Sequence, residues 1–482
     1  MARVVSPGEV REEEKASMAD LDRQAGPVLS RRRVIQAAVV GGLAAGLGSL
    51  LAACGIKTGA TTAPSVAPST ASPAAGSSVA PSVQPSAAAI PFKIGFVSPQ
   101  TGPAAGFGEP DPYTIGLVQA KLAAGFAAAG KNYAVTIIQK DSQSDPAKAA
   151  QVANDLINSD GIDLMLATST PENNNPVADA CEAAGVPCIS TVEPWEAFYF
   201  ARQKDATKPV PFKFTYHFSF GVAQFATTYQ SMWGGPVTTN KKVGVMWPND
   251  ADGNAIRSAL GPALTKAGYT IVDPGAYEDG TNDYSAQIAK FKAENCEIFN
   301  TFPIPPDFAT FWKQAAAQGY VPKIAQIAKT GLFPSQIEDL GDLGPGLASA
   351  AYWTPTFPYS SSLTGISSAE LGSGYTTATG KQWNQDLGTT MALFDCATSA
   401  MAGATDPKDK VALAAAIGKL NITTPVGKVD FTSGPVPNVA VSPIIGGQWV
   451  ATPSGPFKVD FVIVEHATDP NVPIAGALTQ YR

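Results

Sequence analysis

Short apolar runs alternate with longer helical stretches through most of the chain, and this alternation is what most constrains the fold. Phe92 to Val97 is an apolar run, a loop rich in Gly and Pro follows it, and a predicted helix then extends to about Ala129. The same order continues with strands predicted at 133–139, 162–167 and 186–190. Strands separated by single helices predict parallel strands with helices on both faces of the sheet.

The pattern begins again after residue 240. Strands are predicted at 242–247, 269–273, 297–302 and 323–328, with helices at 254–267, 283–293 and 307–318. Each set has about the length of one domain. The sequence therefore predicts two successive and similar α/β lobes.

The N-terminal residues have the order of an export signal. Arg31, Arg32 and Arg33 precede an uncharged stretch rich in Ala, Gly, Val and Leu, which ends at Ala53-Cys54. A positive region, an apolar run and small residues before a cleavage point are the parts of a secretory signal. We expect a twin-arginine lipoprotein signal peptide at residues 1–53 and lipidation of Cys54. A spanning helix is the alternative, and the glycines of the run argue against it.

Residues 54–90 are dominated by Ala, Ser, Pro, Thr, Val and Gly after the cysteine. Such a stretch buries too little apolar surface to offset the entropy cost of ordering it. We predict a disordered linker that joins the folded body to a lipid anchor. The protein would then be extracytoplasmic and held at the cell membrane by Cys54.

Composition and motifs exclude several functions. The chain has 33 Lys and Arg against 40 Asp and Glu, a net charge of −7, and no basic stripe to bind nucleic acid. Its two histidines, His217 and His466, lie on separate segments, so no His-rich metal site is expected. The sequence has no Gly-x-Ser-x-Gly elbow, Walker loop or His-Glu-x-x-His stretch. We predict neither enzymatic activity nor a cofactor.

Two cysteines lie close together in the sequence. Cys181 is late in a predicted helix, and Cys188 begins the next strand after the short Gly185-Val186-Pro187 turn. In an oxidising compartment this spacing allows a disulfide, and two buried thiols are the equal alternative. Cys296 and Cys396 cannot be paired from the sequence.

Several stretches resemble the family of leucine/isoleucine/valine-binding proteins, which have the type I periplasmic binding fold. They are Lys93-Ile94-Gly95 leading to Thr101-Gly102-Pro103-Ala104, and residues 141–149, 184–190, 279–285 and 424–431. The resemblance implies an α/β fold with two Rossmann-like lobes, whose parallel sheets are flanked by helices and joined by crossover hinge strands. It implies a first lobe at 91–216 and 353–425, and a second at 217–352 and 426–482.

The same resemblance implies a function. The protein would be a solute-binding receptor that captures a small molecule between its lobes and delivers it to the permease subunits of an ABC importer. Ligands bind open α/β sheets at the carboxyl ends of the strands. A ligand-sensing receptor of the same fold, feeding a signalling partner, is the alternative. No signalling domain follows the second predicted lobe, which favours transport.

The loops after the predicted strands supply the candidate ligand-binding residues. These are Phe107, Thr168, Ser169, Thr170, Thr191, Glu193, Trp195, Trp247, Phe302 and Lys329. In amino-acid-binding members, hydroxyls of two first-lobe loops hold the ligand carboxylate, and an acidic residue of the second lobe pairs with its ammonium. Here Lys329 is a cation where that anion is expected. We therefore predict that branched-chain amino acids bind weakly, and that a carboxylate or polyhydroxylated ligand stacks on Trp195. If leucine binds tightly, Glu193 is the candidate ammonium partner.

Overall fold

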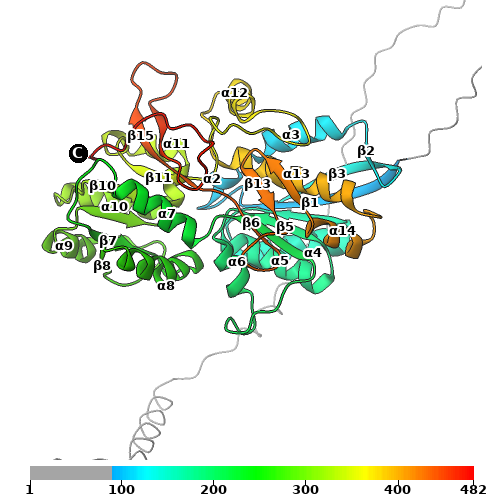
Figure 1. The fold of residues 1–482 in the computed structure, drawn as a ribbon, viewed down its shortest axis with the longest axis horizontal. Coiled ribbons are helices and arrows are strands. Elements are labelled where there is room, and N and C mark those ends of the chain that lie inside the picture. The colour runs from blue at the N-terminus through cyan, green and yellow to red at the C-terminus, as the bar shows by residue number, and fades with distance from the viewer. Residues whose placement is uncertain (1–88) are drawn as a thin grey trace, which may run out of the picture. The chain divides into compact units, whose positions relative to one another are not determined.

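A computed structural model describes residues 89–482 of the chain. The predicted signal peptide, Cys54 and nearly all of the predicted linker lie outside the described residues. Two seven-stranded sheets form the centres of two lobes, and helices cover both faces of each sheet (Figure 1). The predicted fold class is confirmed.

The first sheet has the strand order β14-β6-β5-β4-β1-β3-β2. Its strands are β1 (Ile90–Ser98), β2 (Phe126–Ala128), β3 (Lys131–Asp141), β4 (Leu164–Ala167), β5 (Cys188–Thr191), β6 (Thr215–Ser219) and β14 (Val439–Val441). All neighbours pair in parallel except β2, which is antiparallel to β3. The helices of this lobe are α2 (Ala105–Gly108), α3 (Asp111–Leu122), α4 (Pro146–Asp155), α5 (Pro171–Ala184), α6 (Trp195–Ala201), α12 (Ser368–Thr379), α13 (Asp386–Gly403) and α14 (Lys410–Ile417).

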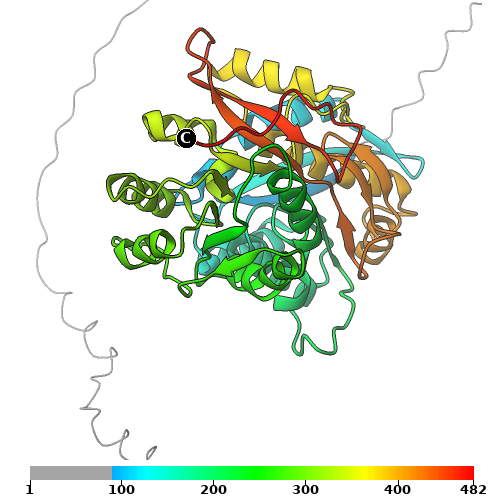
Figure 2. The same cartoon turned by 60° about the vertical axis from the view of Figure 1, so that its left-hand side comes forward.

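The second sheet has the order β16-β15-β11-β10-β9-β7-β8. Its strands are β7 (Lys242–Met246), β8 (Thr270–Val272), β9 (Ile298–Thr301), β10 (Ile324–Ile327), β11 (Ala348–Ala351), β15 (Ile445–Ala451) and β16 (Val459–Glu465). Its helices are α7 (Val222–Trp233), α8 (Ala251–Lys266), α9 (Ser285–Ala293), α10 (Pro305–Ala317) and α11 (Pro334–Asp339). The antiparallel pair β15–β16 completes one edge of this sheet (Figure 2).

Burial explains why these segments read as apolar runs in the sequence. Every residue of β4, β9, β10 and β11 is buried, as expected for parallel strands covered on both faces. Helix α4 begins as predicted, because the Asp145 side chain accepts a hydrogen bond from the Lys148 N–H and Pro146 occupies the first turn.

One predicted helix is too long. The sequence predicts a helix to about Ala129, but α3 ends at Leu122 and residues 126–128 form the edge strand β2. Gly125 and Gly130 have φ values of +91° and +71°, which suit glycine and allow the tight turns on either side of β2. The composition around β2 is dominated by alanine, which hides the strand among helix formers.

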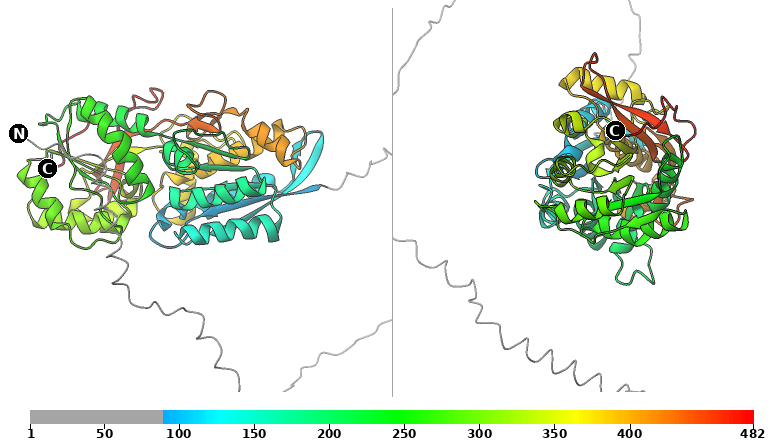
Figure 3. Two further views of the ribbon diagram at one scale, coloured as in Figure 1. Left: turned by 90° about the horizontal axis from the view of Figure 1, so that it is seen from below. Right: turned by 90° about the vertical axis from the view of Figure 1, so that its left-hand side faces the viewer.

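Within the described residues the chain passes between the lobes three times: after β6, after β11, and between β14 and β15. The first and third crossings lie later than the predicted boundaries at 216/217 and 425/426. Ser219 still belongs to β6, and Val439 of β14 pairs in parallel with His217. Residues 424–431 instead form most of a separate hairpin of β12 (Asn421–Thr424) and β13 (Gly427–Asp430). The two lobes lie side by side in the left view of Figure 3.

Candidate ligand-binding site

A cavity lies between the lobes at the carboxyl ends of the strands, and we call it the inner cavity. From the first lobe it is lined by α2 and by the loops after β4 and β5. From the second lobe it is lined by α7, α8 and the loops after β9 and β10. A second cavity, the outer cavity, shares Phe107, Thr170 and Lys329 with it.

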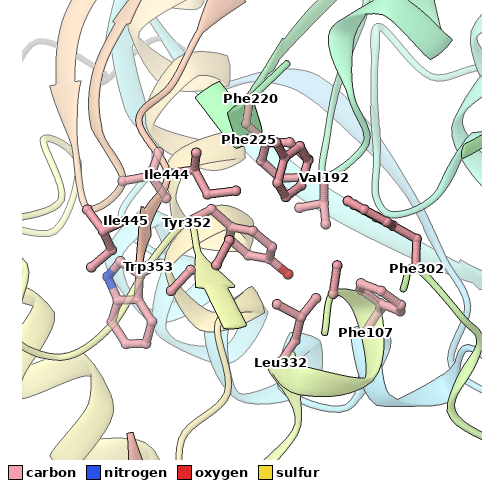
Figure 4. Packing of buried hydrophobic residues seen from close by; sticks show 14 of the residues in the cluster. Phe107, Val192, Phe220, Phe225, Phe302, Leu332, Tyr352, Trp353, Ile444 and Ile445 are labelled. Atoms are coloured by element: carbon pink, nitrogen blue, oxygen red, sulfur yellow. The ribbon is translucent and has the colours of Figure 1, made fainter. Parts of the chain in front are cut away.

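Aromatic rings make up much of the inner wall. They are Phe107, Phe220, Phe225, Phe302 and Tyr352, and Val192, Leu332 and Ile444 fill the gaps between them (Figure 4). Phe225 meets Phe302 edge to face with ring centroids 5.0 Å apart, and Phe220 stacks on Tyr352 at 5.7 Å. Such packing fixes the orientation of the rings. The inner cavity therefore has a rigid apolar wall.

The three crossings between the lobes contribute directly to this wall. Phe220 follows β6, Tyr352 follows β11, and Ile444 precedes β15. The hydroxyl of Tyr352 donates a hydrogen bond to Asp386 Oδ2 at 3.1 Å. The hinge segments are thus part of the site.

Glu193 brings a buried carboxyl group to the inner cavity. Its side chain is 1% exposed, and neither carboxyl oxygen has a hydrogen-bond partner. Burial raises the pKa of Glu193 well above its usual value, and Asp252 and Glu172 raise it further, while Arg202 and Asn174 offset part of this. Such a group is costly to ionise without a partner.

His217 holds the backbone of that loop in place. Its Nε2 lies 3.1 Å from the Glu193 carbonyl oxygen, and its Nδ1 lies 2.9 Å from Ser190 Oγ. Burial lowers the pKa of His217 to about 3, so the ring is neutral at physiological pH. Its role is to position the loop after β5.

Lys329 follows β10 and faces the cavity, but its charge is not free. Its ammonium lies 2.8 Å from Asp250 Oδ2 and 2.7 Å from Asp252 Oδ2, and the residue is only 8% exposed. Burial lowers the pKa of Lys329, but the two carboxylates outweigh this and raise it well above its usual value. Lys329 therefore lies at the cavity as a cation, as the sequence predicts, but its charge is already paired within the second lobe.

The backbone is strained at three of the loops that line the cavity. Thr170, Val192 and Lys329 have φ values of +66°, +64° and +50°, and each lies just after a strand. Positive φ is uncommon outside glycine, and least expected for a β-branched residue such as Val192. Strained residues of this kind cluster at functional sites, where the surrounding structure holds them.

Five of the predicted site residues line the cavity, and five do not. The lining set is Phe107, Thr170, Glu193, Phe302 and Lys329. Thr168, Ser169 and Thr191 are buried beneath the loops instead, and the Thr191 hydroxyl donates to the Phe218 carbonyl at 2.7 Å. The Trp195 ring packs against Phe200, and the Trp247 indole N–H donates to Asn300 at 2.9 Å within the core.

Sequence reasoning missed the lining residues of the hinge and one acidic residue. Phe220, Tyr352 and Ile444 lie at the crossings between the lobes, and no sequence pattern marks these positions as lining residues. Asp252 lies in the first turn of α8, 4% exposed, and burial raises its pKa to about 7 against the opposing effect of Lys329. The position of Asp252 between the strand predicted at 242–247 and the helix predicted at 254–267 was the available signal.

The four cysteines within residues 89–482 are free thiols. Cys181 and Cys188 are both fully buried beside one another between α5 and β5, and no disulfide joins them. Burial raises the pKa of the Cys181 thiol well above its usual value, and Cys188 adds to this. The disulfide alternative is corrected, because the pair packs as two apolar thiols in the core. Cys296 and Cys396 are also buried and free.

A family model described as periplasmic binding protein matches residues 91–451, and the chain belongs to this family. It is thus a solute-binding protein and not an enzyme, since that is the role of the family. No curated protein matches the sequence. Among residues 89–482 no helix is long and apolar enough to cross a membrane, and no cluster of three or more His, Cys, Asp or Glu could hold a metal ion.

Several solved structures share the fold. A leucine-binding protein from Thermotoga maritima is 17% identical with a TM-score of 0.63, over 79% of this chain and 99% of that one. An ABC transporter substrate-binding protein from Sphaerobacter thermophilus is 19% identical with a TM-score of 0.63, over 79% and 98%. A solute-binding protein of an ABC transporter from Rhodopseudomonas palustris BisB5 is 19% identical with a TM-score of 0.61, over 79% and 99%.

Proposed function

We propose that this protein is the extracytoplasmic receptor of an ABC importer, which captures a small molecule between its lobes and delivers it to the membrane permease. One observation carries the proposal: a single cavity is walled by both lobes and by all three hinge crossings that the described residues contain. A ligand there gains contacts with both lobes only when they are closed. It therefore shifts the population toward the closed state, which a permease can recognise.

Anchoring is part of the same proposal. Cys54 would be lipidated after removal of residues 1–53, and the linker would let the folded body reach the permease. A sensor of the same fold would close in the same way but would bind a signalling partner. Copurification of the full-length lipoprotein with permease and ATPase subunits supports import, whereas copurification with a sensor kinase contradicts it.

We propose that the ligand is not a branched-chain amino acid. The reason is no longer the charge of Lys329 alone, as in the sequence analysis, but the lack of free groups that could bind an α-carboxylate. The hydroxyls of Thr168, Ser169 and Thr191 do not line the cavity, and Lys329 is already paired with two aspartates. An α-carboxylate would therefore find no free cation. The same argument disfavours an aromatic acid such as the 3,4-dihydroxybenzoic acid in complex with the Rhodopseudomonas palustris protein, because its carboxylate would also find no free cation.

The test of the receptor role is an unbiased ligand screen on the full chain by thermal shift, followed by mass spectrometry of the recovered ligand. A ligand at a hundred times its dissociation constant should stabilise the protein by about 2.7 kcal/mol. The recovered ligand should be unchanged. Chemical conversion at turnover, or the absence of any stabilising compound in the screen, would refute the receptor role.

A matched pair of variants then tests the site. Phe302→Leu alters the cavity wall, while Phe299→Leu makes the same change at a buried residue of β9 that does not line it. Both should lower stability, because both remove core contacts. Only Phe302→Leu should weaken binding of a screened ligand, by roughly tenfold. Equal losses of affinity in the two variants would contradict the assigned cavity.

A further inference from the structure

We infer that the ligand is an organic cation, a protonated or quaternary amine on an apolar body without a carboxylate, and that its charged nitrogen lies between Glu193 and Asp252. This deepens the proposed function and rests on it. It names the chemical class that the cavity selects.

Charge around the cleft favours a cation. Carboxyl groups from both cavities face the cleft, and they belong to Glu172, Glu193, Asp250, Asp252 and Asp279. Lys329 is the one basic residue that lines either cavity in the described structure, and it already contacts two of these carboxylates. A ligand carboxylate would add negative charge to an acidic site, which costs free energy in a desolvated pocket.

Two carboxyl groups in the inner cavity have oxygen atoms without a hydrogen-bond partner, and Glu193 has no partner at all. Both oxygens of Glu193 and Oδ1 of Asp252 accept no hydrogen bond, although these residues are only 1% and 4% exposed. Buried charges are normally paired, because an unpaired one is costly. An ammonium between the two groups would supply the positive charge that Glu193 lacks, and would be a second cation for Asp252, whose Oδ2 already contacts Lys329.

The two groups also lie on opposite lobes. Glu193 follows β5 in the first lobe, and Asp252 is in the first turn of α8 in the second. Asp252 raises the pKa of Glu193, second only to burial, so the two carboxyls oppose each other's ionisation across the cleft. A cation between them would convert this repulsion into attraction to a shared charge. Binding would then favour closure directly.

The wall of the cavity suits the rest of such a ligand. Phe107, Phe220, Phe225, Phe302 and Tyr352 present aromatic rings to the same space (Figure 4). The faces of aromatic rings attract ammonium groups, and most strongly when the site is desolvated. A metal ion does not fit, because no group of three or more ligating side chains surrounds the cavity within residues 89–482.

Matched probes test the charge on the full-length protein. Phenethylammonium, 3-phenylpropionate and phenethyl alcohol carry similar apolar bodies with a positive, negative or neutral end, and benzyltrimethylammonium is a quaternary probe. Calorimetry should show that a cationic probe binds roughly a hundredfold more tightly than 3-phenylpropionate, since a charge of the wrong sign would be buried beside acids. The neutral alcohol should fall between them.

Two variants locate the charge. Glu193→Gln keeps the shape of the side chain and should weaken binding of the cationic probe roughly tenfold, while 3-phenylpropionate binds no worse than to the wild type. Glu294→Gln also removes one negative charge, but from an exposed position on the surface of the second lobe, and should change neither affinity. Thermal unfolding of each variant shows that it is folded.

Several results would overturn the inference. Tighter or equal binding of 3-phenylpropionate would show that the site does not select a cation. An equal effect of Glu193→Gln on all probes would make Glu193 a structural residue, and no binding of either cationic probe at millimolar concentration would exclude the class. Each of these leaves the receptor role intact, because that role fails only in the unbiased screen or by conversion of the ligand.

Discussion

Replacing Lys329 by methionine removes the positive charge that two buried aspartates share. The ammonium lies 2.8 Å from Asp250 and 2.7 Å from Asp252, so both contacts are lost at once. Methionine has a similar length and adopts the same positive φ no more easily than lysine does. The variant therefore isolates the charge from the backbone strain at this position.

The size of the effect follows from burial. The side chains of the three residues are at most 10% exposed, and breaking a buried ion pair costs about 3–5 kcal/mol because the remaining charge is left unpaired. The pKa of Asp252 is about 7, against about 3.9 in an unfolded chain, and loss of Lys329 raises it further. In the folded variant, Asp252 therefore keeps its proton to higher pH than in the wild type. The stability of the variant relative to the wild type then decreases further as the pH rises through 7.

Urea unfolding at pH 5 and pH 8 measures this difference. We expect a loss of about 2 kcal/mol at pH 5, where Asp252 is protonated, and about 3–5 kcal/mol at pH 8. Lys242→Met is the control, since Lys242 pairs with Glu294 at 3.3 Å with side chains 39% and 50% exposed, and should cost about 0–1 kcal/mol. A loss in the Lys329 variant that does not change with pH would refute the reasoning.

Three further changes have defined outcomes. Burial raises the pKa of Asp111 to about 7, so this group alone should lower the stability of the wild type by about 2–3 kcal/mol between pH 5 and pH 8. Asp111→Asn should therefore make stability, measured by urea unfolding, depend less on pH. Parallel curves of stability against pH for the variant and the wild type would contradict this. Gly221→Ala would place a Cβ against Nε1 of Trp195 with no room for it, so we expect a loss of stability of about 1–3 kcal/mol. Thermal unfolding measures this loss, and an unchanged midpoint would show that the segment repacks freely. Cys54→Ala should release the folded protein from the membrane fraction, and retention that survives lipase treatment would favour a spanning helix.

The fold was predictable because the strands and helices can be recognised from local patterns of apolar residues. Apolar runs such as those at Phe92 and Ile324 are buried on both faces, so the sequence reveals them without knowledge of their neighbours. β2 could not be recognised in this way, because its alanines have no strong strand preference and only pairing with β3 makes it a strand.

The site was less predictable because its chemistry depends on contacts between distant segments. The loop positions of Glu193 and Lys329 follow from the strands, but the pairing of Lys329 with Asp250 does not, since 79 residues separate them. Trp195 lies two residues after Glu193, yet its ring turns toward Phe200 and away from the cavity. The direction in which a loop side chain points depends on how it packs against residues from other segments, and a single sequence does not specify this packing.

The lining of the cavity by Phe220, Tyr352 and Ile444 has a mechanical consequence. These residues lie on the segments that join the two lobes, so a ligand in the inner cavity would contact the connections between the lobes as well as the lobes themselves. A substitution there would alter the ligand's contacts and the angle at which the lobes come to rest in a single step. New ligand preferences could therefore arise at these three positions only together with a change in closure geometry. The loops after β4, β5, β9 and β10 are free of that coupling, and they are where selectivity can vary without disturbing the motion.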